Sequence, residues 1–204
     1  MKIIGLTGPS GAGKTTVCSR FEELGIPCID TDAIYHKLVG SPSPCLMELV
    51  EKFGETIINE DDSLDRAALA SIVFTGDRAK ENLASLNATT HRYVWEEVNK
   101  ILTKYIDEGK KAAVIDAPAL FSSKIFIGAC DFILSVLADK ETRIERILKR
   151  DGISREAALA RIDAQPNDEF FIENSDYYIY NNGTRDEMMH DLSSILEQEG
   201  LYHK

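Results

Sequence analysis

The feature that most constrains this chain is the run Gly8-Pro9-Ser10-Gly11-Ala12-Gly13-Lys14-Thr15. The run has the spacing of a P-loop, in which four residues separate the first glycine from a Gly-Lys-Thr ending. Apolar residues 3–7 precede it, and a stretch typical of a helix, residues 16–24, follows it. A plain connecting turn requires neither the spacing nor the Lys-Thr pair. The order strand, loop and helix therefore predicts an α/β fold built around a phosphate site.

Each residue type in this loop has a chemical reason. Glycine lets backbone N–H groups close around a phosphate, and a helix that starts near Lys14 adds its positive N-terminal dipole. We expect the Lys14 ammonium against the β- and γ-phosphates, and the Thr15 hydroxyl on a Mg²⁺ ion. The loop therefore predicts that a nucleoside triphosphate and Mg²⁺ bind here. The expected binding residues are Gly8, Gly11, Ala12, Gly13, Lys14, Thr15 and Thr16.

Length, composition and charge argue against several other classes of protein. With 204 residues, of which 44% are hydrophobic, the chain 1–204 fits one domain with room for insertions. A net charge of −11 argues against a general nucleic-acid or anionic-membrane binder, because both surfaces repel an acidic protein. No apolar run approaches the ~18 residues of a membrane span, so we expect a cytoplasmic protein. The four cysteines lack metal-ligand spacing, which favours reduced thiols.

Four further apolar runs predict strands, at residues 26–29, 112–116, 132–137 and 177–180. Ligands of open α/β sheets lie beyond the carboxyl ends of strands, so Asp30 and Asp32 are expected to face the phosphate site, with Asp32 on the strand beside the loop. Asp32 is also a candidate N-cap for a helix over residues 33–39. Asp116 ends the next predicted strand. An aspartate at the end of an apolar strand is expected of a Mg²⁺-associated residue in P-loop enzymes, but many other strands also end in aspartate.

Two helical segments extend beyond this sheet pattern. Residues 61–109 contain no convincing strand and exceed the roughly dozen residues that a crossover needs, which indicates a substrate-binding subdomain or, alternatively, plain structural packing. Residues 140–168 carry Arg143, Arg146 and Arg150 along one helical face. This face is either solvated, with ion pairs to glutamates, or a mobile lid whose arginines repel one another until phosphate arrives.

Taken together, these residues resemble the dephospho-CoA kinase family, which phosphorylates the ribose 3′-hydroxyl of dephospho-CoA with ATP in the last step of coenzyme A synthesis. The P-loop is shared by many kinases, but the later motifs in this order are more specific. The matching residues run along almost the whole chain: 5–8, 13–15, 29–32, 64–66, 72–74, 118–121, Arg146, 150–152, 164–165 and 182–183. The resemblance implies a P-loop kinase fold with a five-stranded parallel sheet, helices on both faces, a helical coenzyme-A-binding insert and a helical lid.

The resemblance also implies roles for individual residues. Asp32 would be the base that faces the acceptor hydroxyl, and Lys14 and Arg146 would act on the transferring phosphoryl group. The nucleotide site would further include Arg150, Asn182 and Gly183, the last two near the adenine of ATP. The substrate side would include Asp32, Arg66, His91 and Pro118. A lone histidine such as His91 is equally explained by packing.

Some positions depart from the family pattern. The usual His-Pro pair is His91-Arg92 here, and the usual Pro-Leu-Leu-Phe-Glu has Ala119 and Ser122 at its second and last positions. The arginine expected soon after Gln165 is replaced around Asn167 and Asp168. These departures leave the P-loop, Asp32 and Arg146 intact and concern the acceptor pocket and the lid, and so acceptor specificity and rate. Two rival functions also stay open: a kinase for another small metabolite, such as a nucleoside monophosphate, and a nucleotide sensor without an acceptor.

Overall fold

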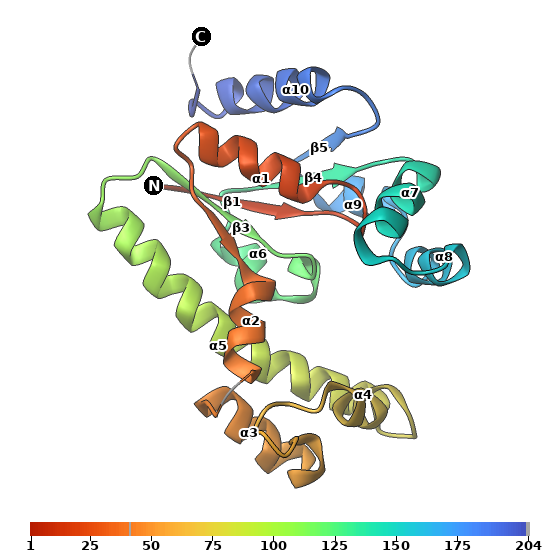
Figure 1. The fold of residues 1–204 in the computed structure, drawn as a ribbon. Coiled ribbons are helices and arrows are strands. Elements are labelled where there is room, and N and C mark those ends of the chain that lie inside the picture. Colours follow the sequence, from red (N-terminus) through yellow and green to blue (C-terminus); the bar gives the residue numbers. More distant parts are fainter. Residues whose placement is uncertain (41, 203–204) are drawn as a thin grey trace. The chain divides into compact units, whose positions relative to one another are not determined.

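The computed structural model describes residues 1–40 and 42–202, and the chain forms two compact units. The first unit consists of Met1–Ile29 and Lys104–Lys204, and it contains the sheet. The second unit, Asp30–Thr103, is helical. Figure 1 labels the elements of both units. No helix of the described residues is long and apolar enough to cross a membrane.

The sheet has five strands in the order β2-β3-β1-β4-β5. Its strands are β1 (Lys2–Thr7), β2 (Cys28–Asp30), β3 (Ala112–Asp116), β4 (Phe132–Leu137) and β5 (Tyr177–Tyr180). β1 lies in the middle and pairs in parallel with both neighbours, so that Ile4 is opposite Val114 on one side and Phe132 on the other. The five-stranded parallel sheet predicted from the sequence is confirmed.

The position of β2 corrects one expectation. The strand that leads to Asp32 does not lie beside β1, because β3 separates the two. The connection from β1 to β2 runs through α1 (Lys14–Glu23). A helix is about 10 Å wide and neighbouring strands are about 4.8 Å apart, so a crossover through a packed helix can pass over one strand position. β3 then fills the vacant position between β1 and β2 later in the chain.

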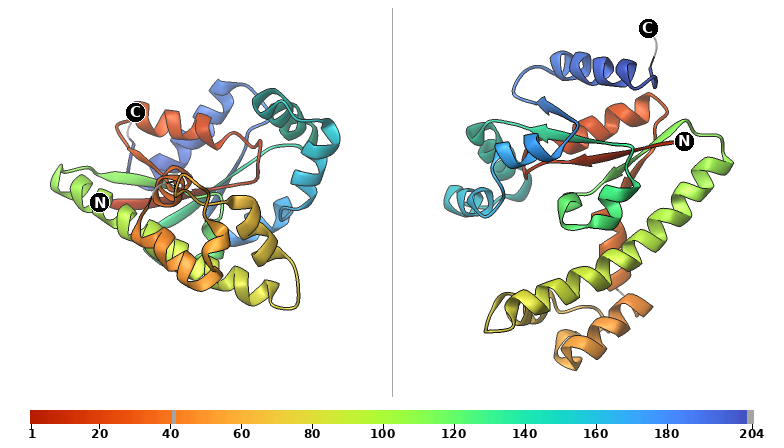
Figure 2. Two further views of the ribbon diagram at one scale, coloured as in Figure 1. Left: turned by 60° about the horizontal axis from the view of Figure 1, so that its bottom comes forward. Right: turned by 180° about the vertical axis from the view of Figure 1, so that it is seen from behind.

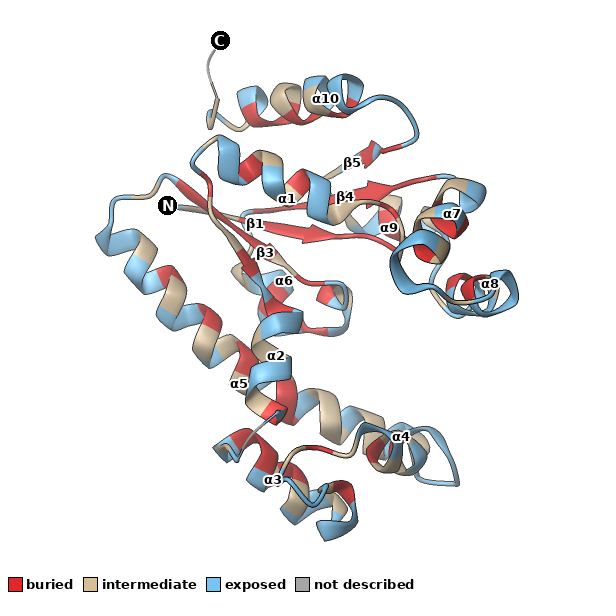
Figure 3. Ribbon diagram, viewed as in Figure 1, coloured by how far each residue is buried: buried red, intermediate tan, exposed pale blue. Residues whose placement is uncertain are grey.

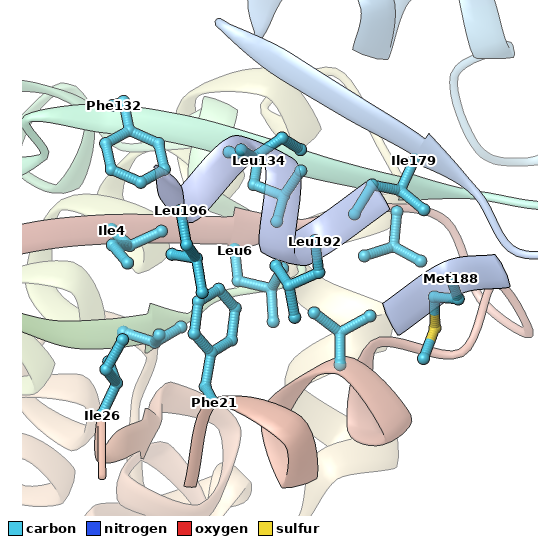
Figure 4. Packing of buried hydrophobic residues seen from close by; sticks show 14 of the residues in the cluster. Ile4, Leu6, Phe21, Ile26, Phe132, Leu134, Ile179, Met188, Leu192 and Leu196 are labelled. Carbon is cyan, nitrogen blue, oxygen red and sulfur yellow. The ribbon is translucent and has the colours of Figure 1, made fainter. Parts of the chain in front are cut away.

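Helices cover both faces of the sheet. α1 and α10 (Arg185–Gln198) lie on the same side of the sheet in Figure 1 and in the right view of Figure 2. Their side chains form one core with the sheet, where Leu192 and Leu196 meet Phe21 and Leu6 (Figure 4). All four are fully buried, and such burial contributes about 1.5–3 kcal/mol per side chain.

The opposite face of the sheet is covered by short segments. A Cβ placed on Gly5 would lie 2.8 Å from Cys130 and 3.0 Å from Leu120, which shows how closely this face is packed. The segments here are η2 (Leu120–Ser122), α6 (Lys124–Ala129) and α9 (Asp168–Asn174), of which α9 contacts β4 and β5. None of these helices was predicted from the sequence, because three to seven residues are too few to show a helical period.

The second unit has a core of its own. It contains α2 (Thr31–Val39), α3 (Pro44–Phe53), η1 (Glu55–Ile57), α4 (Arg66–Phe74) and most of α5 (Ala79–Asp107). Ser43 caps α3 by accepting a hydrogen bond from the Leu46 N–H at 3.0 Å, and Asp65 caps α4. Buried residues of α5 recur every four positions at 90, 94, 98 and 102, so they share one face of the helix (Figure 3).

The segment after β4 is a helical hairpin. α7 (Lys140–Asp151) ends at Gly152, whose φ of 63° suits a left-handed cap, and Ser154 caps α8 (Arg155–Asp163). Ile144 and Ile147 of α7 pack against Ala158 and Ile162 of α8. This small core gives the hairpin a defined shape.

Candidate active site

The P-loop connects β1 to α1 at the carboxyl edge of the sheet. Gly8, Gly11 and Gly13 all have positive φ, at 140°, 81° and 99°, which L side chains rarely adopt. Gly13 is the N-cap of α1 and has no side chain to cap the first turn. The N-terminus of α1 therefore keeps the polarity that favours an anion.

Gly8 also has no room for a side chain. A Cβ at this position would lie 2.1 Å from the carbonyl oxygen of Val136 in β4. We expect Gly8→Ala to lower the free energy of unfolding by roughly 2–5 kcal/mol, from backbone strain and from this clash. The corresponding fall in Tm is roughly 5–15 °C for a chain of this size.

Gly25→Ala is the matched control for Gly8→Ala. Gly25 has φ of 77°, but a Cβ there would meet nothing within 4 Å. Gly25→Ala is therefore expected to lower the free energy of unfolding only through the left-handed backbone conformation, by about 1–2 kcal/mol. Equal changes in Tm for the two variants, measured by thermal denaturation, would contradict the close approach of Gly8 to β4.

The predicted nucleotide residues of the loop lie together in one continuous turn. Lys14 is the first residue of α1, and its Nζ donates a hydrogen bond to the carbonyl oxygen of Gly8 at 3.1 Å. Its ammonium therefore lies over the loop that it is expected to serve. Ala12 is fully buried, whereas Thr15 and Thr16 are exposed. An exposed Thr15 hydroxyl suits a metal site completed by phosphate oxygens and water.

Arg146 is bound to the back of this loop. One guanidinium nitrogen donates to the carbonyl oxygens of Gly11 and Ala12, at 3.3 and 3.0 Å, and the other donates to the carbonyl oxygen of Asn181 at 2.9 Å. Arg143 is 5% exposed and donates to the Ser10 carbonyl oxygen at 2.9 Å. The alternative of a solvated face is therefore wrong for Arg143.

The contacts of the three arginines bear on the expectation that these residues repel one another until phosphate arrives. The loop carbonyls already accept hydrogen bonds from Arg143 and Arg146, and these oppose the repulsion. Arg150 pairs with Asp151 and donates to the Ser10 hydroxyl at 3.3 Å. Burial lowers the pKa of Arg143, while the charge of Asp168 opposes that shift.

Asn181 is a site residue that the sequence analysis missed. Its side-chain amide is buried and donates to the Ala12 carbonyl oxygen at 2.9 Å. A Cβ on Gly13 would lie 2.1 Å from the same amide nitrogen, so loop and asparagine are in close contact. The rule that directed attention to Asp30 applies equally to the end of β5, and it would have found Asn181.

The other predicted residues of the first unit lie around this loop. Asn182 accepts a hydrogen bond from the Asp139 N–H at 2.7 Å, and Gly183 follows it in the turn before α10. Pro118 is exposed, and its carbonyl oxygen accepts a hydrogen bond from the Thr7 hydroxyl at 3.4 Å. The P-loop, the turn before α10 and the residues that follow β3 thus all lie at the carboxyl edge of the sheet.

Asp116 ends β3, the strand directly beside β1. Its Oδ2 accepts a hydrogen bond from the Cys18 thiol at 3.5 Å. The hydrogen bond with Cys28, burial and the Asp116 charge together raise the pKa of Cys18, so this thiol stays protonated. All four cysteines of the chain are free. Within residues 1–40 and 42–202, no three His, Cys, Asp or Glu side chains form a group that could hold a metal.

The remaining predicted residues belong to the second unit. Asp30, and not Asp32, is the N-cap of α2, because its carboxylate accepts a hydrogen bond from the Ala33 N–H at 2.9 Å. Asp32 is exposed in the first turn of that helix. Arg66 contacts Nδ1 of His36 at 2.8 Å, and burial lowers the pKa of His91.

Arg92, at the position where the resemblance led us to expect a proline, has contacts of its own. It pairs with Glu48 of α3, and its guanidinium lies 4.3 Å from the centre of the Tyr93 ring. Glu48 also pairs with Lys52 at 2.9 Å and accepts a hydrogen bond from the Tyr93 hydroxyl at 3.1 Å. An arginine here also preserves the N–H that a proline would remove from α5. Arg92 therefore links α5 to Glu48 of α3.

This network leads us to expect that acid lowers the stability of the second unit. Hydrogen bonds from Lys52, Arg92 and Tyr93 lower the pKa of Glu48 from 4.5 to about 2. Because the folded pKa is below the unfolded one, the contribution of Glu48 to stability is complete above pH 4.5 and is lost as the pH falls toward 2. We expect the difference in Tm between wild type and Glu48→Gln to shrink over this interval. Glu51→Gln, at an exposed site on α3, is the matched control.

Comparison with known proteins bears on the function of this site. The model of the dephospho-CoA kinase family matches residues 2–187. A dephospho-CoA kinase of Bacillus cereus is 40% identical over 196 residues, which cover 96% of each chain. Another, of Carboxydothermus hydrogenoformans, is 36% identical and covers 97% of this chain and 94% of its own.

Solved structures agree with these sequence matches. TT1252 from Thermus thermophilus has a TM-score of 0.80 at 30% identity, over 97% of both chains. The dephospho-CoA kinase from Campylobacter jejuni has a TM-score of 0.65 at 26% identity, over 98% of this chain and all of its own. The similarity therefore covers both the sheet and the helical residues between β2 and β3.

Proposed function

The chain belongs to the dephospho-CoA kinase family, and from this premise we propose that it transfers the γ-phosphoryl group of ATP to the 3′-hydroxyl of dephospho-CoA. The product is coenzyme A, and the reaction is the last step of its synthesis. The observation that carries the proposal is the complete P-loop with Lys14 at the start of α1, within a chain that matches the family from residue 2 to residue 187.

ATP is expected to bind with its phosphates in the P-loop. The N–H groups of the loop and of the first turn of α1 would contact phosphate oxygens, and Lys14 would place its ammonium against the β- and γ-phosphates. Asn182 and Gly183 would border the adenine, and Arg150 would complete the nucleotide site. Arg146, which donates to the loop carbonyls in this structure, would stabilise charge on the phosphoryl group as it transfers.

Thr15 is the residue proposed to hold Mg²⁺. Bound Mg²⁺ neutralises charge on the phosphate oxygens and keeps most of its ligands as water and phosphate. An exposed hydroxyl next to Lys14 fits this need, since Mg²⁺ in such sites takes only one or two protein ligands.

Asp32 is the proposed base for the acceptor hydroxyl. Its carboxylate is exposed, and Asp30 already caps α2, so Asp32 is not required for that structural task. Arg66, His91 and Pro118 are the proposed substrate contacts, and residues 61–109 the proposed coenzyme-A-binding subdomain. Residues 140–168 are the proposed lid. We place the protein in the cytoplasm, as a kinase of a small molecule.

The proposal is tested by following coenzyme A formation from ATP and dephospho-CoA with the purified protein. Isothermal titrations with dephospho-CoA, AMP, CMP and GMP identify the acceptor. We expect turnover and binding with dephospho-CoA only. Binding of a nucleoside monophosphate in its place would indicate a different metabolite kinase. ATP binding without any coenzyme A formation would indicate a sensor, and either result would overturn the proposal.

A further inference from the structure

The environment of Arg143 raises a question that the proposed reaction does not answer. This cation is 5% exposed, and its side-chain hydrogen bonds go to two neutral oxygens, the carbonyl of Ser10 and Oε1 of Gln165. Burying a charge is unfavourable unless hydrogen bonds compensate for the lost water. A surface lysine or a buried apolar residue would serve packing alone at lower cost. Packing alone therefore does not explain why a buried arginine occupies position 143.

These bonds form a closed ring around one residue of the P-loop. Nε of Arg143 donates to the Ser10 carbonyl oxygen at 2.9 Å, and Nη2 donates to Oε1 of Gln165 at 3.0 Å. The same Oε1 accepts a hydrogen bond from the Ser10 N–H at 3.0 Å. Both backbone groups of Ser10 are thus held by side chains from outside the loop, and all three residues belong to the first unit.

The ring sets the direction of the loop's other N–H groups. In a trans peptide the C=O and the following N–H point in opposite directions. Because the carbonyl of Ser10 points to Arg143, the N–H of Gly11 points away from it. The carbonyl of Ala12 points to Asn181 and Arg146, so the N–H of Gly13 points away from them as well. Holding the carbonyls from behind thus directs these N–H groups to the other side of the loop.

We propose that Arg143 and Gln165 are positioning residues, whose hydrogen-bond ring with Ser10 holds the P-loop in its phosphate-binding conformation. Arg143 lies near the start of segment 140–168 and Gln165 near its end, so the ring also ties the loop to both ends of that segment. Neither side chain is required to touch the nucleotide. The inference rests on the proposed nucleotide site and is independent of the acceptor.

The test measures the Kd of MgATP by isothermal titration, without any acceptor. Gln165→Met is similar in size to the native residue, but it removes the acceptor that the Ser10 N–H and Arg143 share. We expect its Kd for MgATP to rise about tenfold, the effect of losing hydrogen bonds that include a charged donor. The Kd of dephospho-CoA is expected to change less than about twofold, and the Tm by less than about 4 °C. Gln198→Met makes the same substitution at an exposed end of α10 and should behave as wild type.

Arg143→Lys separates geometry from charge. Lysine keeps the cation but lacks the planar fork that reaches two acceptors at fixed angles. We expect a rise in the Kd of MgATP of about tenfold here too, because the ring is broken although the charge remains. Arg155→Lys, at an exposed site on the same hairpin, is its control.

Two results would overturn the inference. One is a Kd of MgATP within about twofold of wild type for folded Gln165→Met. The other is an equal loss of affinity for MgATP and dephospho-CoA together with a lower Tm, which would show that the ring only supports the fold. A wild-type protein that binds MgATP but forms no coenzyme A would refute the proposed function and leave this test intact.

Discussion

Replacing Lys14 by alanine is expected to abolish nearly all turnover and to leave the fold unchanged. The ammonium lies over the loop, 3.1 Å from the Gly8 carbonyl oxygen, and does not contribute to a hydrophobic core. A preorganised charge of this kind stabilises a transition state by about 3–4 kcal/mol, which corresponds to roughly 10²–10³ in rate. The measurement is coenzyme A formation at saturating dephospho-CoA, with Tm as the check on folding.

Lys149→Ala is the matched control for Lys14→Ala. Lys149 is an exposed lysine of α7, and its removal should leave turnover within about twofold of wild type. If Lys14→Ala keeps more than about a tenth of wild-type turnover, the proposed contact of Lys14 with the phosphates is wrong.

Asp32→Asn is expected to lower kcat by roughly 10²–10⁴, with little change in ATP affinity or Tm. A ribose hydroxyl is a poor nucleophile at neutral pH, and phosphoryl transfer is assisted when a carboxylate orients the hydroxyl and accepts its proton. Asparagine keeps the size of the side chain but cannot take the proton. Asp30 is the N-cap of α2 in the wild type and in Asp32→Asn alike, so the free energy of unfolding should hardly change.

Asp186→Asn provides a control at an equivalent position. Asp186 is an exposed aspartate in the first turn of α10, as Asp32 is in the first turn of α2. Both substitutions remove one negative charge from a helix N-terminus, a change of about 0.3–1 kcal/mol in stability. Only Asp32→Asn should affect kcat. An unimpaired kcat in that variant would remove Asp32 from the mechanism.

Much of the architecture could be predicted because its signals are local. Apolar runs predicted all five strands within two residues of their observed bounds, and the P-loop predicted a helix that starts near Lys14, where α1 begins. The helical segments predicted at residues 61–109 and 140–168 contain α4, α5, α7 and α8. The short helices α6 and α9 were not predicted, since each spans fewer than two full turns.

The sequence was less reliable where two nearby residues of the same type could take one role, as Asp30 and Asp32 could at the N-cap of α2. The first helical residue of α2 is Thr31 and not Ala33 as predicted, so the cap falls to Asp30. Both aspartates have the chemistry of an N-cap, and only the observed start of the helix decides between them.

The sequence by itself determined that this chain carries a loop for phosphate, because glycine spacing and a Lys-Thr pair act within eight consecutive residues. Only the tertiary structure decided what supports that loop. Arg143 and Gln165 are 22 residues apart in sequence, and Arg143 is 133 residues from Ser10. Their contacts exist because folding brings α7 beside the P-loop, where Arg143 donates to the Ser10 carbonyl oxygen (Figure 1). No local pattern encodes such a distance, since packing is set by the whole core.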